Sequence, residues 1–372
     1  MKILFIGPRI HTNQFNIIKT LKEKGHKVFF HAKFKYKIED HSHVKPKFFK
    51  ESIVSKIIKI LFGTWGMPKI HDLPNFKIYY KEVKKILPDI AIIRVHGFFY
   101  TYFIAIIMKI LKINIIFYDQ KDFYKHYLKL NITSLIKTAE FFLRLKLFKA
   151  TWITPINSNK KRLPNKCFYL PFAVSIIKKN KKITSKKILV VAKPEVTQNY
   201  FLALNVLKKI SKKFDVKMTI VSMVYNSSHK KIKKKALNYV KKNGLKKNIK
   251  FLENIPYSKM KNIYKKNSIF LHPADFQTAP ISICEALGYG LPVICSDACG
   301  TKFHVKNGYN GYIFKKNDSQ SLFNSINKIF ISIKFHNQLS RNAVKDAKKN
   351  ISSENYYKKF KFIIKKQFNL KV

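Results

Sequence analysis

Short apolar runs alternate with helical patterns along this chain, and that alternation restricts the fold more than any other feature of the sequence. Residues 2–7 (KILFIG) form an apolar run. Residues 14–24 carry apolar side chains at helical spacing and stop at Gly25, and a second apolar run follows at 27–31. A strand, a helix and a second strand in this order predict a β–α–β unit, in which the two strands are parallel.

The same alternation continues in two similar halves, separated by a lysine-rich, weakly periodic stretch at 176–187 that indicates a linker. Further strands are predicted at 89–94, 114–118, 152–154, 167–170, 187–192, 218–222, 249–252, 269–272 and 292–296, and further helices at 100–111, 200–214, 230–242, 260–265, 281–288 and 319–329. We therefore predict an α/β protein with two doubly wound, Rossmann-like parallel-sheet domains, 1–177 and 178–350, that face one another across a cleft. In such sheets, ligands bind at the loops that follow the carboxyl ends of the strands.

The chain is strongly basic. Lys and Arg number 75 and Asp and Glu 19, which gives a formal net charge of +56 over 372 residues, and 46% of the residues are hydrophobic. A chain with this apolar content buries a core, and its charge attracts anionic membranes, nucleic acids or phosphorylated substrates. The small number of carboxylates leaves few candidates for chemistry that needs several of them.

The sequence carries no signal for export or membrane insertion. Its first residues lead directly into the first predicted strand, and the longest apolar stretch, 100–117, is interrupted by two lysines, whereas a spanning helix needs about 20 apolar residues. The four cysteines form no CxxC pair, which favours reduced core thiols over a disulfide scaffold or a zinc site. We expect a cytoplasmic protein that is not an integral membrane protein.

The most informative stretch is 271–314, LHPADFQTAPISICEALGYGLPVICSDACGTKFHVKNGYNGYIF. Its pattern predicts a strand ending at His272, a loop, and a helix from Ile281. A helix N-terminus at the carboxyl edge of a sheet presents unpaired N–H groups and partial positive charge, which suits a diphosphate. Glu285, one turn into the helix, is suited to accept hydrogen bonds from ribose hydroxyls, and Gln277 lies in the loop where a sugar would be recognised. The alternative is an ordinary strand–loop–helix unit with a solvated Glu285.

This stretch resembles the C-terminal half of a GT-B glycosyltransferase of the retaining family 4 type, also called glycosyltransferase group 1. The resemblance rests on Pro280, the pair Glu285-Ala286, the run 290–294 (GLPVI), Ser296-Asp297 and the Asn310-Gly311 turn. It implies the GT-B fold, a nucleotide-sugar donor bound by 178–350, an acceptor bound by 1–177, and a final helix within 351–372 that crosses back to the first domain.

The resemblance also implies roles for donor-side residues. Lys193 would be the main cation on the leaving diphosphate, with Gln198 at the family's second basic position. Gln277 stands where the family carries a Glu, and with Thr278 it would contact the sugar. The remaining donor-binding candidates are the backbone of Ala279, Pro280 and Ile281 for the diphosphate and Glu285 for the ribose.

In the retaining route of that family, the leaving diphosphate takes the proton of the acceptor, so neither a metal nor another cofactor is expected. His96, which follows a predicted strand, joins Lys193 and Gln277 as a catalytic candidate. Arg9, Asp119 and Gln120 follow other strands of the first domain and are candidates for the acceptor side. The alternatives are a loop histidine at His96 that is hydrogen-bonded to backbone and a local ion pair of Lys121 with Asp119 or Asp122.

Two basic segments of the first domain, 45–65 and 133–152, show amphipathic helical patterns. In the first, Phe49, Ile53, Ile57, Ile60 and Leu61 share a face surrounded by Lys47, Lys50, Lys56 and Lys59, and in the second the apolar residues are Leu135, Phe142, Leu145 and Phe148. Such helices lie on anionic membranes or pack their apolar stripe on a sheet; both readings stay open.

Taken with the resemblance, these features favour a hexosyltransferase of cell-surface polysaccharide, lipopolysaccharide or glycolipid assembly. It would act on a lipid-linked or glycan acceptor at the inner face of the cytoplasmic membrane. A non-catalytic GT-B-like subunit is the main alternative. A basic nucleic-acid-binding protein is a weaker one, because the sequence has no nucleic-acid-binding motif and its basic residues are scattered; no nucleic-acid partner is expected.

Overall fold

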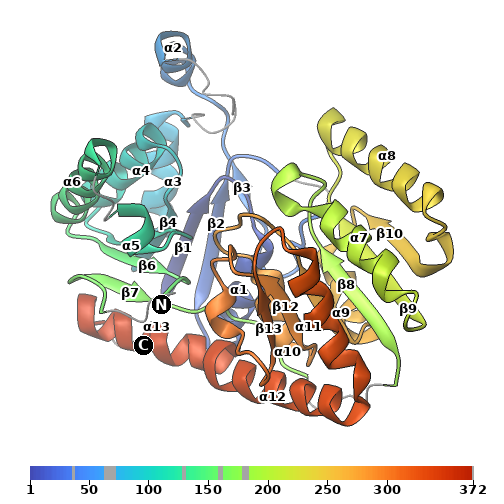
Figure 1. Ribbon diagram of the computed structural model, residues 1–372. Coiled ribbons are helices and arrows are strands. Elements are labelled where there is room, and N and C mark those ends of the chain that lie inside the picture. Colours follow the sequence, from blue (N-terminus) through green and yellow to red (C-terminus); the bar gives the residue numbers. More distant parts are fainter. Residues whose placement is uncertain (36–37, 63–72, 128–130, 158–161, 178–183, 371–372) are drawn as a thin grey trace. The chain divides into compact units, whose positions relative to one another are not determined.

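The chain forms two compact units, Met1–Pro171 with Tyr356–Val372 and Phe172–Asn355 (Figure 1). The computed structural model describes residues 1–35, 38–62, 73–127, 131–157, 162–177 and 184–370. The sequence predicts a boundary after residue 177, whereas the second unit begins at Phe172. The reason is local packing: Phe172 is buried in the second unit's core, and the amides of Val174 and Ile177 donate to the carbonyls of Ile351 and Gly288.

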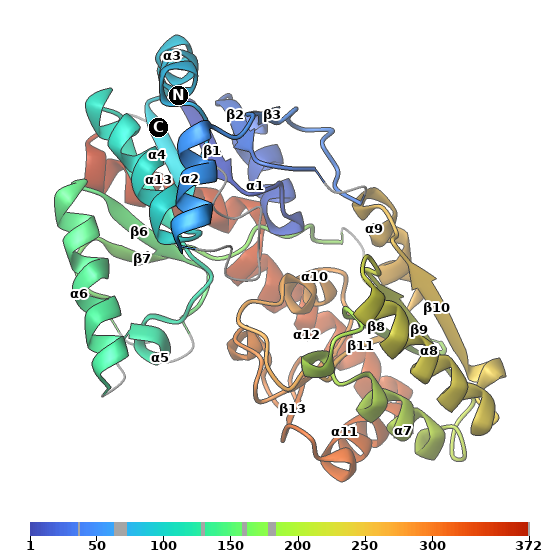
Figure 2. The same cartoon turned by 90° about the horizontal axis from the view of Figure 1, so that it is seen from above.

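The first unit is a parallel sheet with the strand order β3-β2-β1-β4-β5-β6-β7. Its strands are β1 (Lys2–Gly7), β2 (Lys27–Ala32), β3 (Lys47–Phe48), β4 (Ile90–Arg94), β5 (Asn114–Tyr118), β6 (Thr151–Thr154) and β7 (Cys167–Tyr169). Its helices are α1 (Thr12–Glu23), α2 (Ile53–Phe62), α3 (Phe76–Ile86), α4 (Phe98–Ile110), α5 (Phe123–Tyr127), α6 (Ile132–Leu147) and α13 (Ser353–Phe368). Figure 2 shows α3, α4 and α6 in the blue and green part of this unit.

The last helix belongs mostly to the first unit. The Tyr357 hydroxyl hydrogen-bonds His26 at 3.2 Å, and Tyr356, Phe360 and Ile364 of α13 are buried. The Lys359 ammonium lies 4.5 Å from the centre of the Tyr169 ring at the end of β7. The apolar face of α13 therefore covers part of the first unit.

The second unit is a parallel sheet with the strand order β10-β9-β8-β11-β12-β13. Its strands are β8 (Lys186–Val191), β9 (Val216–Ser222), β10 (Ile249–Glu253), β11 (Ile269–His272), β12 (Val293–Ser296) and β13 (Gly311–Phe314). Its helices are α7 (Tyr200–Ile210), α8 (Ser227–Lys242), α9 (Tyr257–Lys266), α10 (Ile281–Gly288), α11 (Ser319–Ile331) and α12 (Ile333–Ile351).

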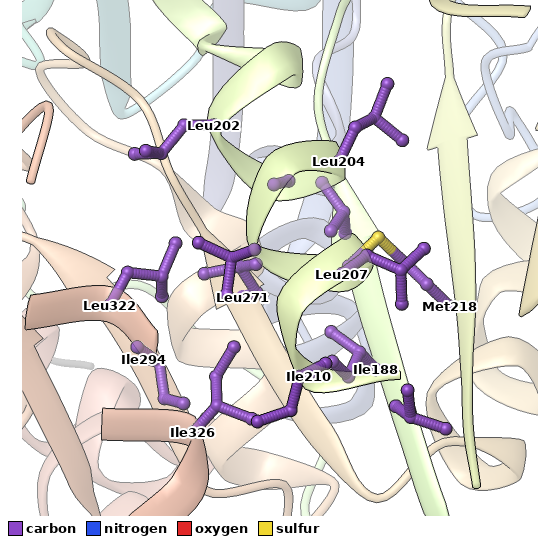
Figure 3. Close-up of a cluster of buried hydrophobic side chains, with 14 of the residues drawn as sticks. Ile188, Leu202, Leu204, Leu207, Ile210, Met218, Leu271, Ile294, Leu322 and Ile326 are labelled. Carbon is purple, nitrogen blue, oxygen red and sulfur yellow. The ribbon is translucent and has the colours of Figure 1, made fainter. Parts of the chain in front are cut away.

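Both faces of the second sheet are buried, as the uninterrupted apolar runs predict. On one face, Ile188 and Leu271 pack against Leu207 of α7 and Ile326 of α11 (Figure 3). On the other, alternate residues of the same strands, such as Phe270, pack under α10 and α12. Helices on both faces confirm the doubly wound α/β prediction for this unit.

Among the described strands and α-helices, sequence analysis missed five: β3, α3, α5, α12 and β13. Helix α12 is lysine-rich and buries small residues such as Ala343 and Ala347, so its apolar period is weak. Strand β13 has only four residues and follows a turn directly. The four cysteines are free and buried, which confirms the prediction of reduced core thiols. Within the part of the chain that the structure describes, we find no helix that is long and apolar enough to cross a bilayer.

The single amphipathic helix predicted for 45–65 is wrong. This segment contains the short strand β3 and then helix α2, and its last residues, 63–65, lie outside the described ranges. Phe49 precedes the helix and packs edge-on against Tyr79, with ring centres 4.8 Å apart. The pairing of β3 with β2 takes the first part of the segment into the sheet, and so removes it from a helix.

The described apolar side chains of helix α2 do not cover the sheet. Its exposed side chains are Ile53 (76%), Val54 (60%), Ile57 (50%), Ile60 (81%) and Leu61 (70%). The core-packing alternative is therefore wrong for this helix.

The prediction for 133–152 is correct only in part. Helix α6 ends at Leu147, and Trp152 belongs to β6. Leu145 and Phe148 are buried in the core, whereas Leu135 and Phe142 are 60% and 42% exposed. The predicted stripe thus divides between the core and the surface.

Candidate functional site

The order of strands in the second unit marks where a ligand would bind. Strands β8 and β11 are neighbours, and the chain leaves them toward opposite edges of the sheet. In doubly wound sheets of this 3-2-1-4-5-6 order, the crevice beyond the carboxyl ends of the two central strands is the ligand site. The loop after β8 contains Lys193 and Gln198, and the loop after β11 contains residues 273–280.

Hydrogen bonds hold these two loops together. The Asp275 amide donates to the carbonyl of Thr197 at 2.8 Å, and Asn199 Nδ2 donates to Asp275 Oδ1 at 2.8 Å. Asn199 also caps α7, because its Oδ1 accepts a hydrogen bond from the Leu202 amide. Its backbone is in the left-handed region, with φ = 50°. The structure therefore brings the loops of Lys193 and of residues 275–280 to one place, as the topology requires.

Lys193 lies in a small charged cluster. Its Nζ is 3.6 Å from Glu195 Oε1, and Glu195 Oε1 is also 3.4 Å from His229 Nε2 at the start of α8. The Lys193 side chain is 42% exposed, and its ammonium lies 5.9 Å from the centre of the Tyr225 ring. Gln198 is buried in the short 3-10 turn Val196–Gln198. Sequence analysis missed Glu195 and His229, because 34 residues separate them in the chain.

No side chain in the described part of the chain caps the N-terminus of α10. Pro280 occupies the cap position, and the first turn contains no acidic residue. The amides of the first turn therefore keep donors and partial positive charge for an anion. Thr278 is exposed, Ala279 and Ile281 are half-buried, and the Thr301 hydroxyl fixes the turn by donating to the Pro280 carbonyl at 3.0 Å.

Gly300 lets the next loop lie directly on this one. Its amide donates to the Gln277 carbonyl at 2.8 Å, and a Cβ at this position would come within 1.7 Å of the Thr278 carbonyl oxygen. The backbone approach is thus open only to glycine. The turn between β12 and β13 in this way supports the loop that precedes α10.

Gln277 is half-buried, and its side-chain Oε1 is buried with no hydrogen-bond partner among the described residues. His272, at the end of β11, is 1% exposed, and neither of its ring nitrogens makes a hydrogen bond of ordinary geometry with the described residues. Burial lowers the pKa of His272 to about 4, and the nearby Gln277 side chain opposes this shift. The imidazole is therefore neutral near pH 7.

The Glu285 carboxylate is buried and holds two tyrosines. Its Oε1 accepts from the Tyr257 hydroxyl at 2.5 Å and its Oε2 from the Tyr264 hydroxyl at 2.8 Å. Burial raises the pKa of Glu285, and both hydrogen bonds oppose that shift. Each oxygen retains a second acceptor position. The alternative of a solvated Glu285 is wrong, and the seven-residue spacing of the two tyrosines on one face of α9 is the sequence signal that would have found its partners.

His272 gives a stability prediction. We expect His272→Leu to raise the free energy of unfolding by about 1–3 kcal/mol at pH 7, because it removes a buried polar group that makes no hydrogen bond of ordinary geometry with the described residues. The stability difference between variant and parent should grow as the pH falls from 6.5 toward 4. Over this range His272 of the parent is protonated in the unfolded chain but stays neutral in the folded protein, which destabilises the folded parent. Urea unfolding of both proteins at pH 7 and 5 measures this, and a variant less stable than the parent at both values would contradict it.

In the first unit, β1 and β4 are the corresponding central strands. Arg9 lies after β1 and pairs with Glu39, with Nη1 to Oε1 at 3.0 Å. His96 lies after β4, half-buried, and its backbone amide donates to the Thr101 hydroxyl at 3.1 Å. The two candidates therefore follow the strands at which the sheet order reverses.

Asp119 and Gln120 follow the adjacent strand β5. Asp119 is buried, which raises its pKa, and its Oδ2 lies 3.8 Å from Lys121 Nζ, so the predicted local ion pair is present. Gln120 Oε1 accepts from Arg94 Nη2 at 2.9 Å. Arg94 itself was missed, although it is one of only five arginines and the last residue of β4. Its Nη1 is buried without a hydrogen-bond partner among the described residues.

Comparison with known proteins agrees with this architecture. Residues 174–346 match the family model of the glycosyl transferases group 1. Over 68 residues the chain is 34% identical to the UDP-Gal:alpha-D-GlcNAc-diphosphoundecaprenol alpha-1,3-galactosyltransferase of Escherichia coli. The aligned segment covers 18% of this chain and 18% of the length of that relative.

Solved structures resemble the whole chain. A glycosyltransferase from Rickettsia africae superposes with a TM-score of 0.76 and 14% identity, over 100% of this chain and 99% of that one. The HepE protein of Anabaena, in complex with UDP, superposes with a TM-score of 0.70 and 14% identity, over 98% and 100%. At these identities the likeness concerns the fold, and it confirms the predicted GT-B class of two parallel-sheet domains.

The family match and the candidate donor site both lie in the second unit. The matched residues contain the switch-point loops, the N-terminus of α10 and the buried Glu285. Residues 174–346 therefore form a domain of the glycosyl transferases group 1, on a chain with the GT-B fold.

Proposed function

We propose that the protein transfers a hexose from a UDP-sugar to a lipid-linked or glycan acceptor in the assembly of a cell-surface glycan. The switch point of the second sheet is the observation that carries the proposal. The loop after β8 contains Lys193, and the adjacent loop after β11 leads into α10, which has the uncapped N-terminus and contains Glu285. The choice of uridine rests on the UDP complex of the Anabaena protein and on the name of the E. coli relative. The lipid-linked acceptor rests on that name too.

The chemistry assigned to these residues is electrostatic. Lys193 and the amides of α10 stabilise the charge that develops on the departing diphosphate, and Glu285 accepts from the ribose. For a retaining transfer, the diphosphate takes the acceptor's proton, so the protein supplies no carboxylate base and no metal. His96, Arg9, Asp119 and Gln120 are proposed to act on the acceptor side.

The decisive experiment separates an enzyme from a binding subunit. UDP-galactose, UDP-glucose, UDP-N-acetylglucosamine and GDP-mannose are each incubated with the protein and a polyprenyl-diphosphate N-acetylglucosamine acceptor, and transfer is followed by mass spectrometry. We expect turnover with one UDP-sugar. Nucleotide-sugar binding without transfer to this or a soluble glycan acceptor would identify a non-catalytic subunit instead.

Substitution of Gln277 tests its proposed contact with the donor sugar. We expect Gln277→Ala to lower kcat by about tenfold, since a neutral hydrogen bond contributes about 0.5–1.5 kcal/mol, and to leave UDP binding unchanged. Kinetics and calorimetry measure the two effects. Gln277→Glu restores the family's carboxylate and serves as the comparison. Wild-type rates in Gln277→Ala would show that this side chain does not touch the substrate.

We further propose that α2 holds the protein on anionic membranes, at the inner face of the cytoplasmic membrane. Its exposed apolar side chains and basic neighbours Lys50 and Lys56 suit a headgroup layer. We expect the combined change of Ile53, Ile57, Ile60 and Leu61 to Ser to abolish sedimentation with phosphatidylglycerol vesicles. The control is Ile331→Ser with Ile333→Ser, an equally exposed apolar pair in the second unit. Equal sedimentation of both variants would refute the role of α2.

A further inference from the structure

A pocket of about 450 Å³ lies in the first unit, away from the carboxyl ends of its central strands. It runs along the outer edge of β2, from Val28 to His31, between α1 and α3. The edge is open because β3 is too short to cover it: β3 pairs only with His31 and Ala32 (Figure 1). The volume is that of an ordinary small-molecule site, roughly 300–1,000 Å³.

The walls of this pocket, which we call the β2-edge pocket, are strongly basic. Among the described residues, five lysines line it against a single carboxylate, that of Glu82: Lys2, Lys22, Lys45, Lys47 and Lys85. Lys47 is paired with Glu82 at 2.6 Å, and Lys2 and Lys22 donate to the carbonyls of Ile86 and His43. Lys45 and Lys85 have neither a hydrogen bond nor an ion pair among the described residues. Their charge is therefore available to a ligand.

A buried histidine adds a directed donor. His31 lines the pocket and is 2% exposed, and its Nδ1 lies 3.0 Å from the Tyr79 hydroxyl. The described residues offer the Tyr79 hydroxyl no other acceptor, which favours donation of its proton to Nδ1 and so places the imidazole proton on Nε2. That Nε2 is buried and has no hydrogen-bond partner among the described residues. A buried N–H without an acceptor, beside lysines, calls for an anionic oxygen.

Apart from His43, the rest of the lining is apolar. Val28, Phe29, Phe30, Val44 and Ile86 complete the walls. A ligand of matching chemistry carries an anionic group at one end and an apolar or planar group at the other. A bare inorganic ion would leave this apolar surface uncovered.

We propose that the β2-edge pocket binds an organic phosphate, with the phosphate among Lys45, Lys85 and His31 and an apolar group on Phe29 and Val44. This site is separate from the proposed donor site, since all its lining residues belong to the first unit and the donor residues to the second. The phosphate comes from a soluble phosphomonoester or from the headgroup of a phospholipid.

Phenyl phosphate is the soluble probe, because it joins a phosphomonoester to an apolar ring. We expect calorimetry on the full chain to show binding that Lys45→Gln with Lys85→Gln weakens by about tenfold or more, equivalent to about 1.4 kcal/mol. The matched control is Lys27→Gln with Lys84→Gln, which removes the same charge from exposed positions of β2 and α3 outside the pocket. All variants are first compared by thermal unfolding.

Two further measurements separate the sources and the sites. Lys193→Gln should leave phenyl phosphate binding unchanged, which distinguishes this pocket from the donor site whatever becomes of the donor proposal. The His31 ring resonance, assigned with His31→Gln, should shift on titration with phenyl phosphate. If only phosphatidic acid vesicles bind, and the pocket variant alone loses them, the phosphate is a lipid headgroup. Equal binding of both probes by the pocket variant and its control, or no binding to the native protein, would overturn the proposal.

Discussion

UDP should bind roughly tenfold to a hundredfold more weakly to Lys193→Ala than to the native protein. A hydrogen bond to a charged group contributes about 1.5–3 kcal/mol, and Lys193 is the cation that the loop after β8 offers to a diphosphate. Its present partner, Glu195, is 3.6 Å away and remains to hold the loop in the variant. Titration calorimetry at low salt measures the change.

The control for Lys193 is Lys209→Ala, which removes an exposed lysine from the last turn of α7 in the same unit. It should bind UDP as the native protein does, because only general attraction is lost. Equal affinities of the two variants would show that the diphosphate is bound elsewhere.

Glu285 needs a different comparison, because its carboxylate also holds Tyr257 and Tyr264. We expect Glu285→Ala to weaken UDP but to leave the weaker binding of 2′,3′-dideoxyuridine diphosphate almost unchanged. The analogue lacks the ribose hydroxyls, so it has no contact to lose. An equal loss for both nucleotides would assign Glu285 a purely structural role.

The largest structural effect is expected from Gly300→Ala. A Cβ there would lie 1.7 Å from the Thr278 carbonyl oxygen and 2.7 Å from its carbonyl carbon, so one of the two backbones must move. Such overpacking costs about 1–3 kcal/mol. The segment that moves is the one before α10, so UDP affinity should fall together with the free energy of unfolding.

Gly7→Ala is the matched control for Gly300→Ala. A Cβ at Gly7 meets its nearest atom at 3.6 Å, an ordinary contact, and its backbone does not need glycine. Urea unfolding and UDP titration of both variants should separate them clearly. A Gly300→Ala protein with native stability and native UDP affinity would show that the two loops are not held in contact.

Local patterns explain why much of the fold could be predicted. The strand β1 and the helix after it follow from the spacing of apolar residues over a dozen positions, and each such spacing is read without knowing the rest of the chain. Helix α12 was not predicted because small residues such as Ala343 and Ala347 separate its buried Leu339 and Ile351, which leaves a weak apolar period. Helix α2 shows the opposite limit of such patterns. Its apolar side chains could be recognised from the sequence, but the sequence of the helix does not determine whether those side chains pack on the sheet or face solvent.

The sequence by itself determined the doubly wound fold, the loop before Ile281 and the place of Glu285, because each depends on neighbours along the chain. Only the tertiary structure decided that Tyr257 and Tyr264 hold Glu285, that Glu195 joins Lys193 to His229, and that Arg94 meets Gln120. The same holds for the lysines gathered along β2. These groups come from segments far apart in the sequence, and the order of strands in each sheet, which no local spacing encodes, sets which of them meet.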